Sequence, residues 1–164
     1  MIPRLIAVVL SLLIMAVVSA AEIPVFDIAK TVIKMQIEKG VSIDDAISSL
    51  KLRANVLNMK LVAHQPLSEE YKALGLPNVN RTEIFQFCDA KIAKEMIEYD
   101  ISYAAYMPCR ITLVVDKHGT GWFVTMDMNI FIASAKLPER LRKLATDVHK
   151  TLMEMMEAGV SGEL

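Results

Sequence analysis

Apolar and polar residues alternate along five segments of the chain with the two-residue period of half-buried strands. The alternation is clearest at residues 31–38, where Ile33, Met35 and Ile37 are separated by polar side chains. The other segments are residues 60–64, 82–88, 109–116 and 122–128. The Lys117-His118-Gly119 turn joins the last two, so they are predicted to form a hairpin.

Between these segments the apolar residues recur every three or four positions, which indicates helices. Ser42 and Asp45 form a capping box before an apolar stripe that runs from Ile43 to Leu57. Asp89 is predicted to cap a helix that presents Ile92, Ala93, Met96 and Ile97 on one side.

Two further helices are predicted from their end signals. A short one spans residues 68–75, with Ser68 as its cap and Gly75 as its stop. Pro138 opens a long final helix. The segment between Tyr99 and Pro108, rich in Tyr and Ala, is predicted to be a loop.

The resulting order is strand, helix, strand, short helix, strand, helix, hairpin, helix. It predicts an α+β fold, a two-layer sandwich in which helices pack on one face of a five-stranded, mostly antiparallel sheet. We expect one domain at residues 30–160, preceded by an irregular lead-in at residues 21–29.

Residues 1–20 are predicted to be a signal peptide. Arg4 is followed by an apolar run, and Val18-Ser19-Ala20 supplies the small residues that precede cleavage, expected after Ala20 or Ala21. An uncleaved membrane anchor is the alternative, but an apolar stretch of about fourteen residues is shorter than the roughly twenty that span a bilayer. The mature protein is therefore expected to be periplasmic or secreted, with membrane contact only through the signal before cleavage.

Charge argues against two classes of partner. Without residues 1–20 the chain keeps 17 basic and 19 acidic residues, a net charge near −2. Nucleic acids and anionic membranes both favour a positively charged partner. No nucleic-acid partner is expected.

The order of several short patterns is similar to that of a known family. These patterns are Cys88-Asp89-Ala90 before a helix, Met107-Pro108-Cys109, the hairpin, and Met126-Asp127 before a long final helix. Over residues 31–159 the chain resembles domain-of-unknown-function family 302. The resemblance implies a compact two-layer α+β fold, often dimeric, found in bacteria and archaea. It brings no settled activity, so Cys88, Pro108 and Cys109 enter as family-pattern residues of undetermined role.

Two cysteines in an exported protein raise the question of a disulfide. If the strands that carry Cys88 and Cys109 ran parallel, the helix between them would leave the sulfurs about 20 Å apart, too far for a bridge. An antiparallel arrangement, or a Cys109 still in the loop, would bring them together. Two free, mostly buried thiols are the other possibility.

Soft-metal binding is the most specific chemistry that the composition permits. Thiolate and thioether sulfur suit Cu(I), and the candidates are Cys109, Met107, Met126, Met128 and the imidazole of His64. Their spacing matches no ligand motif. No cofactor is predicted, and a redox or metal-handling role with copper or haem, based on Cys88 and Cys109, is the alternative function.

A binding role is the leading functional hypothesis, because no nucleophile elbow or phosphate loop is present and the sequence favours a non-enzymatic protein. Phe85 and Phe87 lie opposite Ile84 on their strand, and Trp122 lies opposite Phe123. Helices on one face would leave apolar side chains exposed on the other, as at an interface or ligand groove. A second copy, a small ligand or a periplasmic protein could occupy that face, unless residues 23–28 fold over it.

Overall fold

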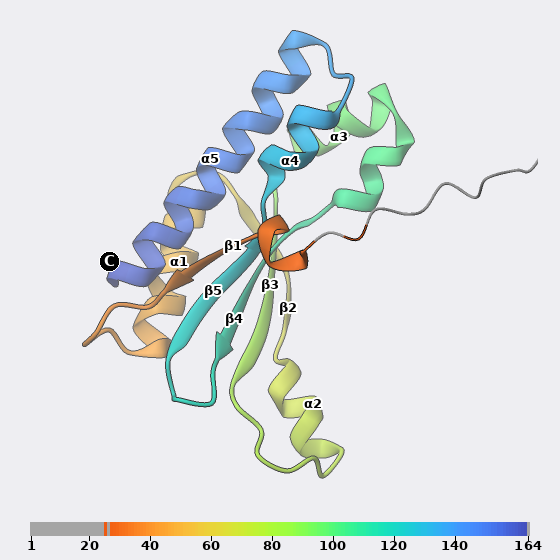
Figure 1. Ribbon diagram of the computed structural model, residues 1–164. Helices are drawn as coiled ribbons and strands as arrows, with labels where there is room; N and C mark the ends of the chain where they lie inside the picture. Colours follow the sequence, from red (N-terminus) through yellow and green to blue (C-terminus); the bar gives the residue numbers. More distant parts are fainter. Residues whose placement is uncertain (1–24, 26, 164) are drawn as a thin grey trace, which may run out of the picture.

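The computed structural model describes residue 25 and residues 27–163, so the predicted signal peptide at residues 1–20 lies outside the described residues. Twelve elements follow one another along the chain (Figure 1). They are η1 (Ile28–Thr31), β1 (Val32–Gln36), α1 (Ile43–Val56), β2 (Lys60–Gln65), α2 (Leu67–Ala73), β3 (Thr82–Cys88), α3 (Ala90–Tyr99), η2 (Ile101–Tyr106), β4 (Cys109–Val115), β5 (Gly121–Met126), α4 (Met128–Ser134) and α5 (Glu139–Ser161).

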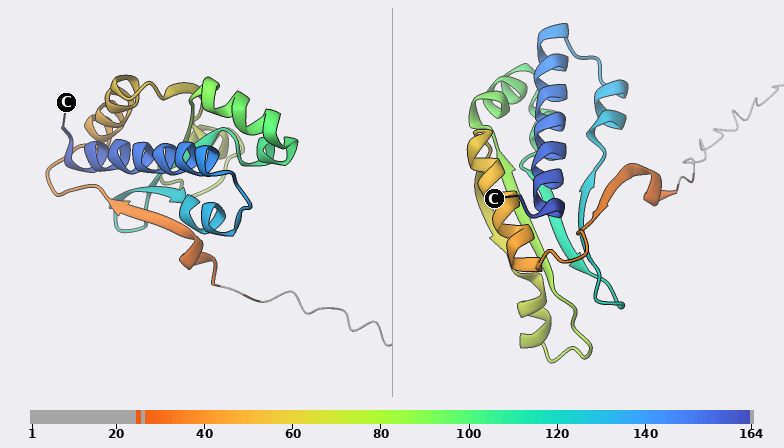
Figure 2. Two further views of the ribbon diagram at one scale, coloured as in Figure 1. Left: turned by 90° about the horizontal axis from the view of Figure 1, so that it is seen from above. Right: turned by 90° about the vertical axis from the view of Figure 1, so that its left-hand side faces the viewer.

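The five strands form one sheet in the order β1-β5-β4-β3-β2, and every neighbouring pair is antiparallel. Helices α1 and α5 pack against each other on one face of this sheet (Figure 2). The predicted α+β sandwich is confirmed, as is the β4–β5 hairpin. In the described part of the chain, no helix has both the length and the apolar character needed to cross a membrane.

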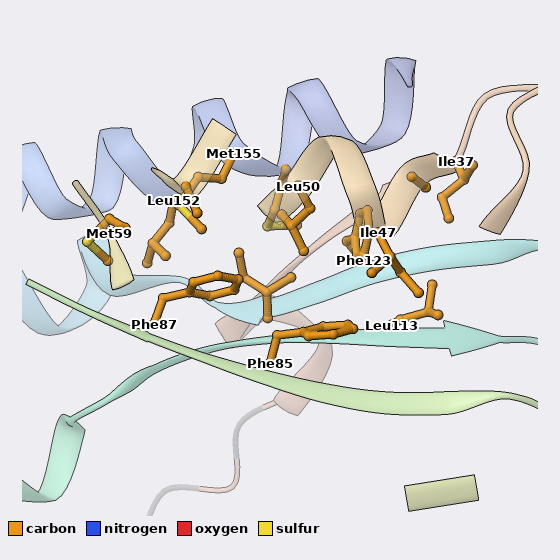
Figure 3. Packing of buried hydrophobic residues seen from close by; sticks show 14 residues of the cluster. Ile37, Ile47, Leu50, Met59, Phe85, Phe87, Leu113, Phe123, Leu152 and Met155 are labelled. Carbon is orange, nitrogen blue, oxygen red and sulfur yellow. The ribbon is translucent and has the colours of Figure 1, made fainter. Parts of the chain in front are cut away.

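The core lies between the sheet and the α1–α5 pair (Figure 3). Phe85 and Phe87 of β3 and Phe123 of β5 point from the sheet toward the helices and have no exposed surface. Leu50 of α1 and Met155 of α5 meet them from the helical layer and are also fully buried. The strand alternation puts these side chains on one face because successive residues of a strand point to opposite sides.

A glycine allows α5 to approach both α1 and the sheet. A Cβ added at Gly159 would lie 2.7 Å from Cε2 of Phe123 and 3.2 Å from the carbonyl oxygen of Ala46 in α1. Such contacts are shorter than van der Waals packing permits. The absence of a side chain at this point therefore fixes how closely the helical layer can cover the core.

Local signals set most helix ends as predicted. The Ser42 hydroxyl accepts a hydrogen bond from the backbone N–H of Asp45 at 3.1 Å, and α1 begins at the next residue, Ile43. Gly75 follows α2 with φ +69°, the left-handed conformation that glycine adopts most easily. Ser68, however, does not cap α2: it is buried in the first turn, and Pro66 holds the cap position without a side-chain hydrogen bond.

Two further predictions were wrong, and both concern short helices. The segment predicted as a loop at 99–108 contains the 3-10 helix η2, which starts after Asp100 accepts a hydrogen bond from the N–H of Ser102. The fifth strand ends at Met126 rather than Met128, because Asp127 accepts from the N–H of Asn129 and starts α4. In each case an aspartate side chain caps a short helix that the hydrophobic pattern did not indicate.

The N-terminal lead-in leaves the second face of the sheet uncovered at the described positions. Val25 is 102 % exposed and Ile28 is 69 % exposed, so neither side chain packs on the sheet. Residues 23, 24 and 26 lie outside the described residues. Ile84, Val114, Trp122 and Val124 remain half-buried on the face opposite the core.

A cluster of charged residues lies on the core-facing side of the sheet, near the N-terminal end of β3. The carboxylate of Glu83, a residue only 7 % exposed, accepts hydrogen bonds from Nε of Arg81 at 2.5 Å and pairs with Nε2 of His64 at 2.6 Å. Arg81 also pairs with Asp44 at the start of α1 at 2.7 Å. Burial by itself raises the pKa of Glu83, but its bonds to Arg81 and His64 outweigh burial and lower that pKa below its ordinary 4.5.

This cluster predicts a specific pH dependence for the Glu83→Gln variant. A carboxylate whose folded pKa is depressed stabilises the protein above its unfolded pKa, and that stability is lost as pH falls through the folded value. We expect the variant to be less stable by about 1–2 kcal/mol at pH 7, a range that allows for the partly exposed Arg81. The deficit should shrink toward pH 3, measured by urea unfolding.

Glu98→Gln is the matched control, since Glu98 pairs only with Lys94 along an exposed face of α3. It should leave the free energy of unfolding nearly unchanged at both pH values. A deficit for Glu83→Gln that stays constant from pH 7 to pH 3 would contradict the assigned role of the Glu83 charge.

Candidate functional site

A cavity of about 380 Å³ lies at one end of the sheet, where β3, β4 and β5 meet α3, η2, α4 and α5. Figure 1 shows α3 and α4 at this same end, beside the N-terminal half of α5. Most of its lining is apolar. The volume lies within the range of about 300–1,000 Å³ typical of sites for small ligands.

Three elements that form the cavity walls, α3, η2 and α4, each begin after an aspartate cap. Asp89 follows β3 and accepts hydrogen bonds from the backbone N–H groups of Lys91 at 2.8 Å and Ile92 at 3.1 Å. Asp100 and Asp127 start η2 and α4 in the same way. Because each carboxylate caps a helix, its lone pairs are directed at backbone donors rather than only at the cavity.

Cys88 and Cys109 both line this cavity. Cys109 pairs with Phe87 in the antiparallel β3–β4 register, and Cys88 is the next residue after Phe87. Both thiols line the cavity, and both are free and half-buried. The parallel arrangement that would have separated them by about 20 Å is therefore wrong, because the connection through α3 and η2 returns the chain to an antiparallel neighbour.

Burial keeps both thiols protonated. Burial, and to a smaller extent the negative charge that Cys88 would carry, raise the pKa of Cys109 to about 11. Burial and then the neighbouring Asp89 charge raise the pKa of Cys88 as well. A reactive cysteine needs the opposite shift, so near neutral pH neither thiol is an activated nucleophile.

The structure brings together most of the candidate site residues and separates one. Met107, Pro108, Met126 and Met128 line the same cavity as the cysteines. His64 does not: it lies on β2, stacks on Phe85 at 4.6 Å between ring centroids, and pairs with Glu83. His64 is thus engaged with the charged cluster, away from the sulfur atoms.

Three aromatic residues of the site were missed from the sequence. Tyr103 and Tyr106 come from η2, and Phe131 comes from α4. The rings of Tyr106 and Phe131 contact each other with centroids 5.4 Å apart, which joins the two helices across the cavity. The signal that could have found them is the pair Asp100 and Asp127, each a helix cap followed by a short apolar run.

Polar contacts hold α4 in place beside the cavity. Arg142 of α5 donates to the carbonyl oxygens of Ile132 at 2.6 Å and Ala135 at 2.9 Å, and so satisfies carbonyls at the end of α4. On the strand side, the Thr125 hydroxyl donates to the carbonyl of Arg110 at 2.6 Å. These bonds fix both the helix and the strand ends that form the wall.

Comparison with known proteins identifies similar sequences and folds. The family model described as "Domain of unknown function DUF302" matches residues 33–159. One similar solved structure is an uncharacterised conserved DUF302 protein from Bacillus stearothermophilus, with a TM-score of 0.67 and 14% sequence identity, covering 78% of this chain and 97% of that one. At this identity the likeness concerns the fold alone. A comparison with curated proteins gives no match.

Proposed function

Because the chain belongs to the DUF302 family, whose description specifies no activity, we propose a function from its own geometry: the protein binds a small, mostly apolar ligand and catalyses no reaction. The observation that carries this proposal is the 380 Å³ cavity, with apolar walls from both the sheet and the helices. Apolar concave sites with a few polar groups are where proteins bind small molecules.

The chemistry of the lining favours binding over catalysis. Its two thiols are protonated near neutral pH, and the carboxylates of Asp89 and Asp100 accept backbone hydrogen bonds as helix caps. Its hydroxyl groups, such as those of Ser102 and Tyr103, border a mainly apolar space. This supports recognition of an apolar body with few hydrogen bonds, and it gives little support to the alternative of thiol-based redox exchange.

Filling the cavity should abolish binding of an apolar probe. Ala93 lines the cavity from α3, so Ala93→Phe places a ring where the ligand would lie. We expect N-phenyl-1-naphthylamine to bind the wild-type protein with increased fluorescence, and the variant to bind it at least about tenfold more weakly. Fluorescence titration measures both affinities.

Ala90→Phe is the matched control, because Ala90 lies on the same helix but is exposed and outside the cavity. It should bind the probe like the wild type. Ala135→Phe, which enters the cavity from the end of α4, provides a second test if Ala93→Phe folds poorly by circular dichroism. A wild-type protein that does not bind the probe, or cavity variants that bind it normally, would refute the proposal.

We also propose that the open face of the sheet binds a second copy of the chain. Ile84, Val114, Trp122 and Val124 form an apolar centre there, and Lys34 and Arg110 stand on the same face. An apolar centre within a polar rim is the composition of a protein interface. A two-fold contact would bury the same side chains from both copies.

This interface predicts the mass of the protein in solution. Val124→Glu puts a charge in the centre of the face and should give a monomer, whereas the wild type should have the mass of two chains at micromolar concentration in light scattering. Lys150→Glu, an exposed change on α5, should leave the dimer intact. A monomeric wild type would remove this proposal without affecting the cavity.

Finally, we propose that the protein is exported and acts in the periplasm or outside the cell. The support is the apolar run and small-residue site of residues 1–20. Expression of the full chain in a bacterial host should give a periplasmic protein whose intact mass begins at Ala21 or Glu22. Leu12→Arg, which interrupts the apolar run, should retain the full-length chain in the cytoplasm; a full-length cytoplasmic wild type would contradict export.

A further inference from the structure

Helix α4 forms one wall of the cavity but buries none of its own residues. Met128, Phe131, Ile132 and Ser134 of α4, with Ala135 just after it, line the cavity. In contrast, α5 has buried residues along its whole length. Because burial of apolar surface holds helices against the rest of a protein, α4 is the less firmly packed of the two.

The start of α4 is anchored both to the sheet and to α5. The backbone N–H of Asp127 donates to the carbonyl oxygen of Thr31, just before β1, at 2.9 Å. The side-chain amide of Asn129 pairs with Nε2 of His149 in α5 at 2.8 Å. His149 is buried, so this pair is shielded from water. The N-terminal end of α4 is therefore a fixed point.

The other end of α4 is held by side chains that bind its last carbonyl groups. Arg142 donates to the carbonyl oxygens of Ile132 at 2.6 Å and Ala135 at 2.9 Å, and the Tyr99 hydroxyl donates to that of Lys136 at 3.0 Å. The last carbonyls of a helix have no partner within the helix, so these bonds depend on the position of α4. Figure 1 shows α4 beside the N-terminal half of α5, joined to it by a loop at this end.

An aromatic contact closes the seam between α4 and η2. The rings of Phe131 and Tyr106 lie 5.4 Å apart between centroids. Phe131 is 37 % exposed and Tyr106 is 49 % exposed, so separating them takes less apolar surface from the interior than parting two core side chains would. This seam is where the cavity wall opens at the smallest loss of burial.

The other walls are more firmly held. The strands belong to the sheet, and α3 buries Met96. The 3-10 helix η2 packs against α3 and is confined between α3 and β4, which begin and end within two residues of it. In contrast, residues 135–138 separate α4 from α5 and leave room for its C-terminal end to move.

We propose that α4 is a lid of the cavity, which opens by swinging about its N-terminal end, and that Arg142 is the latch that holds it closed. The inference rests on the proposed function, because a lid has a role only where a ligand enters. Local opening of a weakly packed element is a common way for proteins to admit ligands to enclosed sites.

Hydrogen exchange of the full-chain protein measures the opening directly. We expect the amides of residues 130–135 to exchange at least about tenfold faster than those of residues 148–156 in α5, and to be slowed by saturating N-phenyl-1-naphthylamine. Arg142→Gln removes the guanidinium and should speed exchange in α4 at least about tenfold further, since two charge-assisted hydrogen bonds are lost.

Stopped-flow fluorescence with the same probe separates a latch from a merely structural residue. In Arg142→Gln both the association and the dissociation rate should rise at least about fivefold, while Kd changes less than about threefold, because the latch binds α4 whether or not a ligand is inside. Damage to the cavity would instead weaken affinity without faster association. Tyr99→Phe keeps the ring and removes the bond to Lys136, so it should shift both rates in the same direction by a smaller factor. It provides the test if Arg142→Gln is not folded by circular dichroism.

Arg140→Gln is the matched control, since it makes the same change on the same helix but Arg140 pairs with Glu95 of α3. It should exchange and bind like the wild type. The lid is refuted if the α4 amides are as protected as those of α5, or if Arg140→Gln changes the rates as much as Arg142→Gln does. A wild type that binds no probe removes the proposed function and the lid together. Normal probe affinity with unchanged rates in both Arg142→Gln and Tyr99→Phe removes the lid alone.

Discussion

The structure depends on the burial of one face of an antiparallel sheet by the α1–α5 pair. Phe85, Phe87 and Phe123 have no exposed surface because Leu50 and Met155 close over them from the helices. Burial of a large side chain of this kind contributes about 1.5–3 kcal/mol. The rest of the fold accommodates this contact, including Gly159, where any side chain would push α5 away from Phe123 and α1.

The cavity lies at the end of the sheet that the α1–α5 pair does not close off completely. The α1–α5 pair closes over the middle of the sheet, whereas at the end of β3, β4 and β5 the walls come from α3, η2 and α4 together with α5. These elements are short and begin at aspartate caps, so they surround the strand ends without filling the space between them. Because β3 and β4 are antiparallel, Cys88 and Cys109 lie at the same end of the sheet, and both are half-buried there.

Charge is placed at the opposite end of β3, away from the sulfur atoms. Glu83 accepts hydrogen bonds from Arg81 and His64, and these bonds keep its carboxylate ionised despite burial. In the sequence His64 was one more soft-metal candidate, since an imidazole at a strand end has no partner that can be read from spacing. In the folded protein the β2–β3 pairing places His64 beside Glu83, so its imidazole binds that carboxylate and lies apart from the sulfur atoms.

The sequence alone determined the five strands, the long helices and that Phe85 and Phe87 share one face of their strand, because period and capping are properties of neighbours along the chain. It could not determine that the strands of Cys88 and Cys109 are antiparallel neighbours, or that Tyr106 and Phe131 meet across a cavity. Those facts depend on contacts between residues far apart in sequence. Spacing indicates which way a side chain faces, and only the packed layers decide what it meets there.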